Sequence, residues 1–427
     1  MTTRFLLRGG TVLTLGAKTA NHAEADVLID DGKVAEIGPG LRARDAELVD
    51  ATDTIVMPGF VDTHRHAWRS LFRNLGEYGS SPEMSVGTVG EHYGPEDVYA
   101  ATLIGLLGAV EAGITTVVDW AELVLDDASA DAALQAHRDA GLRTVLVPGT
   151  ASRHLLERVT QGAGPSTSVA VGAELVDPGR TTERRTVARD LGARLHIHAA
   201  EGIPGAVARL AVQDPLGADV TLVHGAGFDE ADLDAIRSSG AAVSLTPSSE
   251  MAGGLGSLPI QELIDRDIRP GLGIGDEQVA PGDLFAQMRA TISLQHATVF
   301  DRKLAGKAGL PKLMSTRDVI RSATVDGARV AGVDAVTGSI ELGKQADLIL
   351  LRTDRPNIFP INDPIGAVVW GMDTSNVDWV FVGGRVVMRE GHLQGDVQRA
   401  RSLATAARQR VAEASGLVVG ASTGGER

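Results

Sequence analysis

Short apolar runs alternate with longer helical stretches over residues 58–334, and this alternation is typical of repeated βα units. Helical patterns run, for example, over residues 95–111 and 229–239, and each is followed within two residues by a glycine. Eight candidate strands lie among them, at residues 60–66, 115–119, 143–147, 168–173, 195–198, 220–224, 242–245 and 272–276. The pattern predicts an α/β fold, a (β/α)8 TIM-type barrel, in which active sites gather at the carboxyl ends of the strands.

Both ends of the chain show a different pattern, of short β-strands separated by glycine-containing turns. Gly9-Gly10 and Asp31-Gly32 predict two hairpins near the N-terminus, and Gly383-Gly384 predicts one near the C-terminus. Neither end can bury a core alone, so we expect one small β-sandwich domain from residues 1–57 and 335–400. The barrel then spans residues 58–334, and residues 401–427 form a C-terminal helix, centred on 403–414, and a tail.

The amino-acid composition and net charge of the chain exclude several classes of function. The chain has 427 residues and no cysteine, which excludes disulfides, thiolate metal ligands and a cysteine nucleophile. The formal net charge of −15 argues against nucleic acid or an anionic membrane as a partner and favours a small-molecule substrate. No apolar run approaches the ~20 residues that span a bilayer, and the N-terminus lacks a signal-peptide core, so we expect a cytoplasmic protein. A homo-oligomer is compatible with the sequence, which gives no oligomeric state.

The candidate chemistry begins at the end of the first predicted barrel strand, which carries His64 and His66. Successive side chains of a strand point to opposite faces, so these two imidazoles project to the same side. His198 ends the fifth strand, His224 the sixth and Asp276 the eighth. If the strands form one barrel, all five side chains converge on one mouth.

This set suits a metal-dependent hydrolase. His64, His66, His198 and Asp276 would bind one divalent ion, Zn2+ in the first place with Fe2+ as the alternative, and metal-bound hydroxide would attack the substrate. Glu201 would carry a proton between the water and the substrate, His224 would orient the hydroxide or stabilise the developing charge, and Asp276 would accept a proton. His196 shares a face with His198 but lies one layer deeper, so we expect no ligand role for it.

The sequence Pro58-Gly59-Phe60-Val61-Asp62-Thr63-His64-Arg65-His66 resembles the opening motif of the amidohydrolase superfamily. His198-Ala199-Ala200-Glu201, His224 and Asp276 resemble the rest of its mononuclear cytosine/guanine deaminase and triazine hydrolase (chlorohydrolase-like) branch, and the similarity covers nearly the whole chain. The resemblance implies the metal ligands and catalytic residues already named, and a β domain built from both ends. Binuclear relatives bridge their metals with a carboxylated lysine, but no lysine lies between Lys33 and Lys303, which leaves one metal ion as the natural reading.

Two positions depart from that resemblance. Glu122 follows Asp119-Trp120 where relatives usually have a histidine, so this wall of the pocket carries an acceptor in place of a donor. Gly275 occupies the place of the relatives' strand-eight aspartate, so Asp276 faces the mouth only if the strand bulges there. Without Asp276 the metal ion would have histidine ligands alone.

Candidate substrate contacts are Trp68, which could stack on a planar ring, with Arg69, Glu122 and Glu250. We expect the long segment 68–94 to form a lid or pocket wall. Arg65 points away from His64 and His66, which favours a structural ion pair.

The sequence therefore predicts a metal-dependent hydrolase of a C–N bond in a nitrogen heterocycle, most simply a deaminase of a purine-, pyrimidine- or triazine-like molecule. One alternative is a hydrolase that opens a cyclic amide ring. An alternative of another class is a protein that keeps the fold but performs non-hydrolytic chemistry or only binds a ligand.

Overall fold

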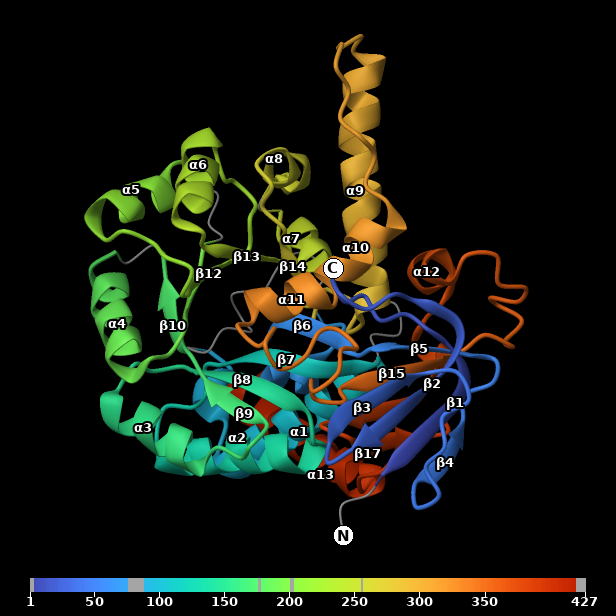
Figure 1. The fold of residues 1–427 in the computed structure, drawn as a ribbon. Helices are drawn as coiled ribbons and strands as arrows, with labels where there is room; N and C mark the ends of the chain where they lie inside the picture. Colours follow the sequence, from blue (N-terminus) through green and yellow to red (C-terminus); the bar gives the residue numbers. More distant parts are fainter. Residues whose placement is uncertain (1–3, 76–87, 176–177, 200–202, 255, 420–427) are drawn as a thin grey trace.

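The computed structural model describes residues 4–75, 88–175, 178–199, 203–254 and 256–419. Strands from both ends of the chain lie side by side in one nine-stranded sheet, as the sequence predicts (Figure 1). Antiparallel pairing of β5 with β15 joins the two ends, with Val56 opposite Leu350. The strands of this sheet are β1 (Phe5–Val12), β2 (His22–Asp30), β3 (Lys33–Gly38), β4 (Glu47–Asp50), β5 (Thr54–Pro58), β15 (Leu348–Arg352), β16 (Val377–Val382), β17 (Arg385–Arg389) and β18 (His392–Leu393).

Two of the three predicted hairpins are confirmed. β2 pairs with β3 around Asp31-Gly32, and β16 pairs with β17 around Gly383-Gly384. The hairpin expected at Gly9-Gly10 is wrong, because β1 runs through both glycines as one strand. Its register with β2 shifts between Leu7 and Gly10, so the glycines form an irregularity within a strand rather than a reversal of the chain.

The central part of the chain forms two all-parallel sheets. One contains β6 (Phe60–Arg65), β7 (Ile114–Ala121), β8 (Arg143–Pro148) and β9 (Thr167–Val169), and the other contains β10 (Val171–Glu174), β11 (Leu195–His198), β12 (Val220–Val223), β13 (Ala242–Leu245) and β14 (Gly271–Leu272). The predicted strand at 168–173 is therefore divided at Ala170 into β9 and β10. A parallel bridge between Arg65 and Gly275 links β6 to the segment that follows β14. Because the strands within each sheet are parallel, their carboxyl ends lie at the same edge.

The eighth predicted strand is much shorter than expected, since β14 has only two residues. Gly275 has φ of +72°, a left-handed conformation that interrupts a strand and that glycine adopts without strain. The segment still follows β6 closely, because Gly275 N donates to His64 O at 2.8 Å and His66 N donates to Gly275 O at 3.2 Å. A Cβ atom at Gly273 would lie 2.7 Å from His64 N, so only glycine fits this approach.

Helices follow most of the central strands and cover them (Figure 1). The helix predicted at 95–111 has those bounds, and Asp229 and Gly240 cap α6 as the sequence indicates. The C-terminal helix is longer than predicted and packs on α1, where Arg410 pairs with Asp97. The helices are α1 (Pro95–Glu111), α2 (Asp127–Ala140), α3 (Arg153–Gly162), α4 (Pro178–Leu191), α5 (Ala206–Gln213), α6 (Glu230–Ser239), α7 (Pro247–Ala252), α8 (Ile260–Asp265), α9 (Leu284–Leu304), α10 (Thr316–Ser322), α11 (Val325–Val330), α12 (Pro364–Gly366) and α13 (Val397–Ser415), with short 3-10 or π turns at Ala67–Phe72, Gly90–His92, Ala367–Gly371 and Thr374–Asn376.

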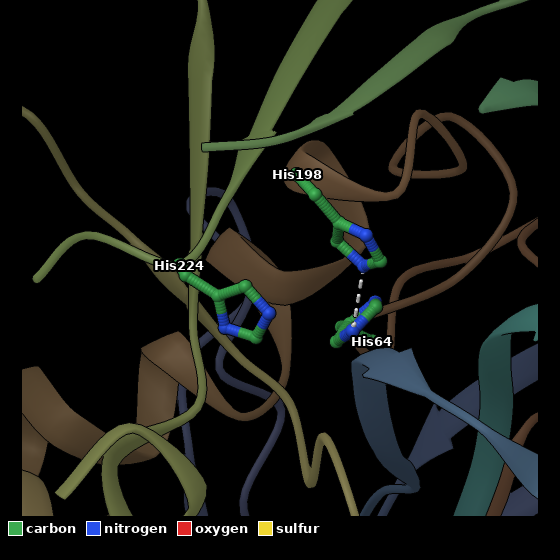
Figure 2. Close-up of side chains that lie close together, drawn as sticks. All are labelled: His64, His198 and His224. Atoms are coloured by element: carbon green, nitrogen blue, oxygen red, sulfur yellow. Dashed lines mark hydrogen bonds between the residues drawn. The ribbon is translucent and has the colours of Figure 1, made fainter. Parts of the chain in front are cut away.

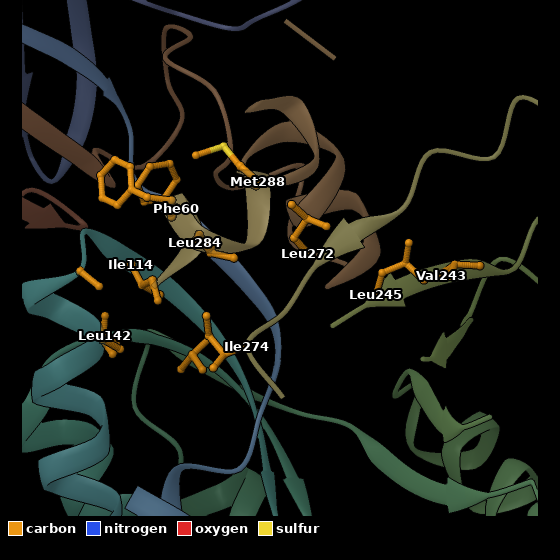
Figure 3. Packing of buried hydrophobic residues seen from close by; sticks show 14 of the residues in the cluster. Phe60, Ile114, Leu142, Val243, Leu245, Leu272, Ile274, Leu284 and Met288 are labelled. Atoms are coloured by element: carbon orange, nitrogen blue, oxygen red, sulfur yellow. The ribbon is translucent and has the colours of Figure 1, made fainter. Parts of the chain in front are cut away.

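The largest core joins the central strands to the helices and to the nine-stranded sheet. Figure 3 shows the part of it where Phe60, Ile114 and Leu272 from the strands meet Leu284 and Met288 from α9. Phe60 and Phe285 pack edge to face with ring centroids 4.9 Å apart. Within the described residues, none of the helices is both long enough and apolar enough to span a bilayer.

Candidate metal centre and active site

Four histidines from three strand ends lie close to one another around His64. His64 Nε2 lies 3.1 Å from His66 Nε2 and 3.3 Å from His198 Nε2. His224 follows β12. One ring nitrogen from each of His64, His198 and His224 lies within 4.8 Å of the other two. Figure 2 shows the rings of His64, His198 and His224 directed toward a common space. The structure thus brings together all four histidines that the sequence singled out.

Carboxylates behind two of these rings decide which nitrogen carries the proton. His66 Nδ1 lies 2.8 Å from Glu122 Oε1, and His198 Nδ1 donates to Glu174 Oε1 at 3.0 Å. A neutral imidazole has one N–H and one lone pair, and a carboxylate only accepts, so the proton of His198 is on Nδ1. The Nε2 atom of His198 therefore presents a lone pair toward His64, and Glu122 lies where it favours the same tautomer of His66.

The spacing of these atoms suits a metal ion. Two nitrogens bound to one tetrahedral zinc ion at about 2.0–2.1 Å are separated by about 3.3–3.4 Å, and the observed separations are 3.1 and 3.3 Å. Burial and the neighbouring histidines lower the pKa of His64 well below its usual value, so the imidazole is neutral, the form that binds a metal. The donor set fits a divalent ion of the zinc type.

His224 is held in an unusual conformation. Its φ of +69° is left-handed, which costs a residue with a Cβ atom about 1–3 kcal/mol and is found mainly at functional sites. Its Nδ1 atom hydrogen-bonds with Thr246 Oγ1 at 2.8 Å, which leaves Nε2 for the centre. Burial lowers the pKa of His224, and the nearby Glu250 offsets part of this effect.

Glu250 supports that conformation from behind. Its carboxylate accepts the backbone N–H groups of Gly225, Ala226 and Thr246 at 2.8–2.9 Å. The side chain is 1% exposed. The sequence suggested that Glu250 would bind a substrate N–H; in the structure both of its oxygens accept backbone N–H groups.

Trp68, Arg69 and Glu122 form a second, largely buried cluster beside His66, with 13% and 15% of the Arg69 and Glu122 side chains exposed. Trp68 Nε1 donates to Glu122 Oε2 at 2.5 Å, and Arg69 Nη2 donates to Glu122 Oε1 at 3.3 Å. Burial raises the pKa of Glu122, but His66 and Arg69 outweigh it and lower that pKa to about 2. The indole packs edge to face on Tyr93 and lies beneath the Arg69 guanidinium. These side chains thus have protein partners where the sequence suggested substrate contacts.

Asp276 belongs to this second cluster rather than to the group of converging histidine nitrogens. Its Oδ2 atom accepts Arg69 Nη1 at 2.7 Å, and its Oδ1 atom accepts the backbone N–H of Gln278 at 2.9 Å. The residue is 4% exposed. The cause is the left-handed turn at Gly275, which directs Asp276 toward Arg69. The expectation that Asp276 completes a metal shell with His64 thus concerns a carboxylate that has Arg69 and Gln278 as its partners.

The structural role expected for Arg65 is confirmed. Its guanidinium is fully buried and pairs with Asp62 Oδ2 at 2.7 Å and Glu277 Oε1 at 3.1 Å. This pairing fixes the end of β6 to the segment after β14, because Asp62 Oδ1 also accepts Ile274 N at 3.0 Å. His196 is buried beneath the site, and neither of its ring nitrogens has a hydrogen-bond partner.

Sequence reasoning missed several supporting residues. Glu174 is the last residue of β10, and a carboxylate at such a strand end was a signal that could have identified it. Trp120 stacks on His198 with ring centroids 3.7 Å apart. Thr246, the hydrogen-bond partner of His224, carried no sequence signal. Glu201 and residues 76–87 of the expected lid lie outside the described residues.

Comparisons with known proteins agree with this geometry. Residues 55–387 match the Amidohydrolase family. The chain is 26% identical over 416 residues to the 5'-deoxyadenosine deaminase of Methanosarcina mazei, covering 90% of this chain and 93% of that protein. It is 28% identical over 417 residues to the 5-methylthioadenosine/S-adenosylhomocysteine deaminase of Natronomonas pharaonis, covering 90% and 92%.

Solved structures show the same fold. A zinc-bound adenosine deaminase from Xanthomonas campestris superposes with a TM-score of 0.82 at 20% identity, covering 96% of this chain and 99% of that one. The atrazine chlorohydrolase of Arthrobacter aurescens complexed with zinc gives a TM-score of 0.83 at 22% identity, covering 95% and 100%.

The family match and the relatives named deaminases indicate a hydrolytic enzyme that acts on C–N bonds. The chain belongs to the amidohydrolase family, as the motif around His64 indicated.

Proposed function

We propose that this protein is a zinc-dependent aminohydrolase that removes an amino group from a purine ring, with a purine nucleoside of the 5'-deoxyadenosine or 5-methylthioadenosine kind as substrate. The observation that carries the proposal is the group of His64, His198 and His224, which have ligand nitrogens within 4.8 Å of one another, with His66 Nε2 only 3.1 Å from His64 Nε2. The curated relatives named deaminases support the reaction and the substrate class.

We further propose that the two parallel sheets close into a single (β/α)8 barrel over residues 58–334, and that residues 1–57 and 335–400 form the small β domain. The Arg65–Gly275 bridge between the first and eighth strand segments supports closure. In such a barrel the carboxyl ends of all the strands form one mouth, so the histidine cluster occupies the usual place of an active site.

The residues divide into those that hold the metal ion and those that move protons. His64, His66 and His198 would bind one zinc ion, with Glu122 and Glu174 keeping the protons of His66 and His198 on Nδ1. The ion, when bound, supplies Lewis-acid activation of a water molecule. Hydrolytic deamination adds the oxygen of water to the ring carbon, breaks the C–N bond and releases ammonia. We assign the transfer of a proton from that water to the ring nitrogen, and then to the leaving amine, to Glu201.

The test is an ammonia-release assay with purified, zinc-loaded protein on adenine nucleosides, with cytosine, guanine and amino-triazines as further substrates. We expect ammonia from at least one adenine nucleoside and a product whose absorbance shifts as the amino group is replaced by oxygen. Glu201→Gln should lower turnover by at least about 100-fold, which is the lower end of the range for loss of a general acid–base group. The zinc content should stay unchanged. Consumption of a cyclic amide with no ammonia released would contradict deamination and favour ring opening.

A further inference from the structure

Asp276 is fully engaged by the protein. Arg69 binds one carboxylate oxygen at 2.7 Å, and the backbone N–H of Gln278 binds the other at 2.9 Å. Asp276 is buried and the Arg69 side chain is only 13% exposed, so water screens the attraction between their charges little. Asp276 is not part of the group of His64, His198 and His224 with ligand atoms within 4.8 Å of one another, so the pairing holds this carboxylate apart from them.

Arg69 is itself fixed on its other side. Its Nη2 atom donates to Glu122 Oε1 at 3.3 Å, and the same oxygen lies 2.8 Å from His66 Nδ1. Trp68 Nε1 holds the second oxygen of Glu122. One cation thus lies between two carboxylates, and the three charges form a connected clamp that reaches from His66 to Asp276. We call this set (Arg69, Glu122 and Asp276) the carboxylate clamp.

His224, unlike Asp276, is directed toward the other histidines. Its backbone adopts a left-handed conformation that three hydrogen bonds to Glu250 hold in place through the neighbouring N–H groups. Because the Thr246 hydroxyl donates to Glu250 Oε1 at 3.3 Å, it accepts from His224 Nδ1, and the lone pair of His224 is then on Nε2, in the space shared with His64 and His198. A strained residue with this much support has been positioned for a ligand or a metal ion.

We infer that the metal shell of this protein consists of four histidines, His64, His66, His198 and His224, and that the carboxylate clamp keeps Asp276 outside it. The inference rests on the proposed function only in that this function requires the metal ion. Four neutral ligands leave the full charge of the ion uncompensated, which makes it a stronger Lewis acid than a shell with one carboxylate. Asp276 then acts as a positioning residue for Arg69.

The experiment compares zinc binding by Asp276→Asn and His224→Asn with that of the wild-type chain, by chelator competition and by elemental analysis after dialysis. Asp276→Asn should change zinc affinity by less than about tenfold, the smallest effect that loss of an outer partner usually has. His224→Asn should lower it by more than about 100-fold, beyond the range of outer partners. His296→Asn, a histidine of α9 that hydrogen-bonds with Met314 O, is the control and should leave zinc affinity unchanged.

Zinc X-ray absorption of the wild-type protein provides a second readout that does not depend on turnover. We expect scattering from four imidazoles, and from three in His224→Asn where zinc can still be loaded at excess. Loss of zinc in Asp276→Asn with retention in His224→Asn would overturn the inference, as would a spectrum with three imidazoles in the wild-type protein. Failure of the proposed function is distinct, because it would appear as zinc-loaded wild-type protein that releases no ammonia from any heterocycle.

Discussion

Glu122 Oε1 lies 2.8 Å from His66 Nδ1, behind a ring whose other nitrogen faces His64. This contact sets the tautomer of His66 and connects the histidine cluster to Arg69. Because a metal-binding histidine depends on the partner of its second nitrogen, Glu122 has more influence on the site than a residue of the pocket wall would have.

Glu122→Gln should therefore weaken zinc binding by about 10–100-fold. Trp68 and Arg69 donate to the two oxygens of the carboxylate and His66 Nδ1 lies 2.8 Å from one of them, whereas an amide offers a single oxygen in its place. Glu174→Gln is the matched comparison and should have a smaller effect, because the Glu174 side chain is 49% exposed and water can replace it. Chelator competition measures both; an equal or larger effect for Glu174→Gln would contradict the role given to Glu122.

Arg69→Met should destabilise the metal-free protein by about 3–5 kcal/mol, the cost of leaving buried charged partners unpaired. Glu122 and Asp276 would both lose the cation that lies between them. Urea unfolding followed by circular dichroism measures the change. Arg153→Met removes an arginine that is half exposed beside Glu157 and Asp190, and it should alter stability by no more than about 0.5 kcal/mol.

Gly273→Ala should cost about 1–3 kcal/mol of stability, the usual range for overpacking. The new methyl group would lie 2.7 Å from His64 N and 2.8 Å from His64 O, so the end of β6 must move. Zinc affinity should fall together with stability, because His64 is displaced. Gly164→Ala meets nothing within 4 Å and is the control; similar losses in both variants would contradict this packing argument.

The Glu277 carboxylate should make the folded protein less stable in acid than at neutral pH. Burial raises its pKa, but Arg65 and Arg73, with a hydrogen bond from Ser70, outweigh burial and hold the pKa of Glu277 below its usual value. A lowered folded-state pKa means that the stabilisation is fully present above the unfolded pKa of about 4.3 and is lost as the pH falls through the folded pKa. The difference in unfolding free energy between wild type and Glu277→Gln should shrink as the pH falls from about 6 to about 3. A constant difference would show that the Glu277 charge does not stabilise the fold.

Much of the fold follows from local sequence signals. Pro95 and Gly113 mark the ends of α1, and the apolar runs at 195–198 and 242–245 match β11 and β13. The eighth strand could not be delimited in this way, since its conformation depends on contacts of Gly273 and Gly275 with His64, far away in the chain. The prediction of a turn at residues 9–10 was wrong for a similar reason, because the pairing of β1 with β2 decides whether the chain reverses there.

The same distinction between local sequence signals and distant contacts applies to the site. Strand alternation and strand polarity were enough to predict that His64, His66, His198 and His224 would meet. The partners of Arg69 were out of reach, because Asp276 lies 207 positions away and the pairing depends on the left-handed turn at Gly275. The sequence did show that Asp276 was displaced, but only the packed structure reveals what the displaced carboxylate contacts.

The most direct test of the central claim is ammonia release from 5'-deoxyadenosine, or a related adenine nucleoside, before and after removal of metal with a chelator. We predict that the zinc-loaded protein releases one ammonia per substrate consumed, that the metal-free protein is inactive while still folded, and that added zinc restores turnover. Release of ammonia at an undiminished rate by metal-free protein, or no release from any nucleoside by fully loaded protein, would contradict the account.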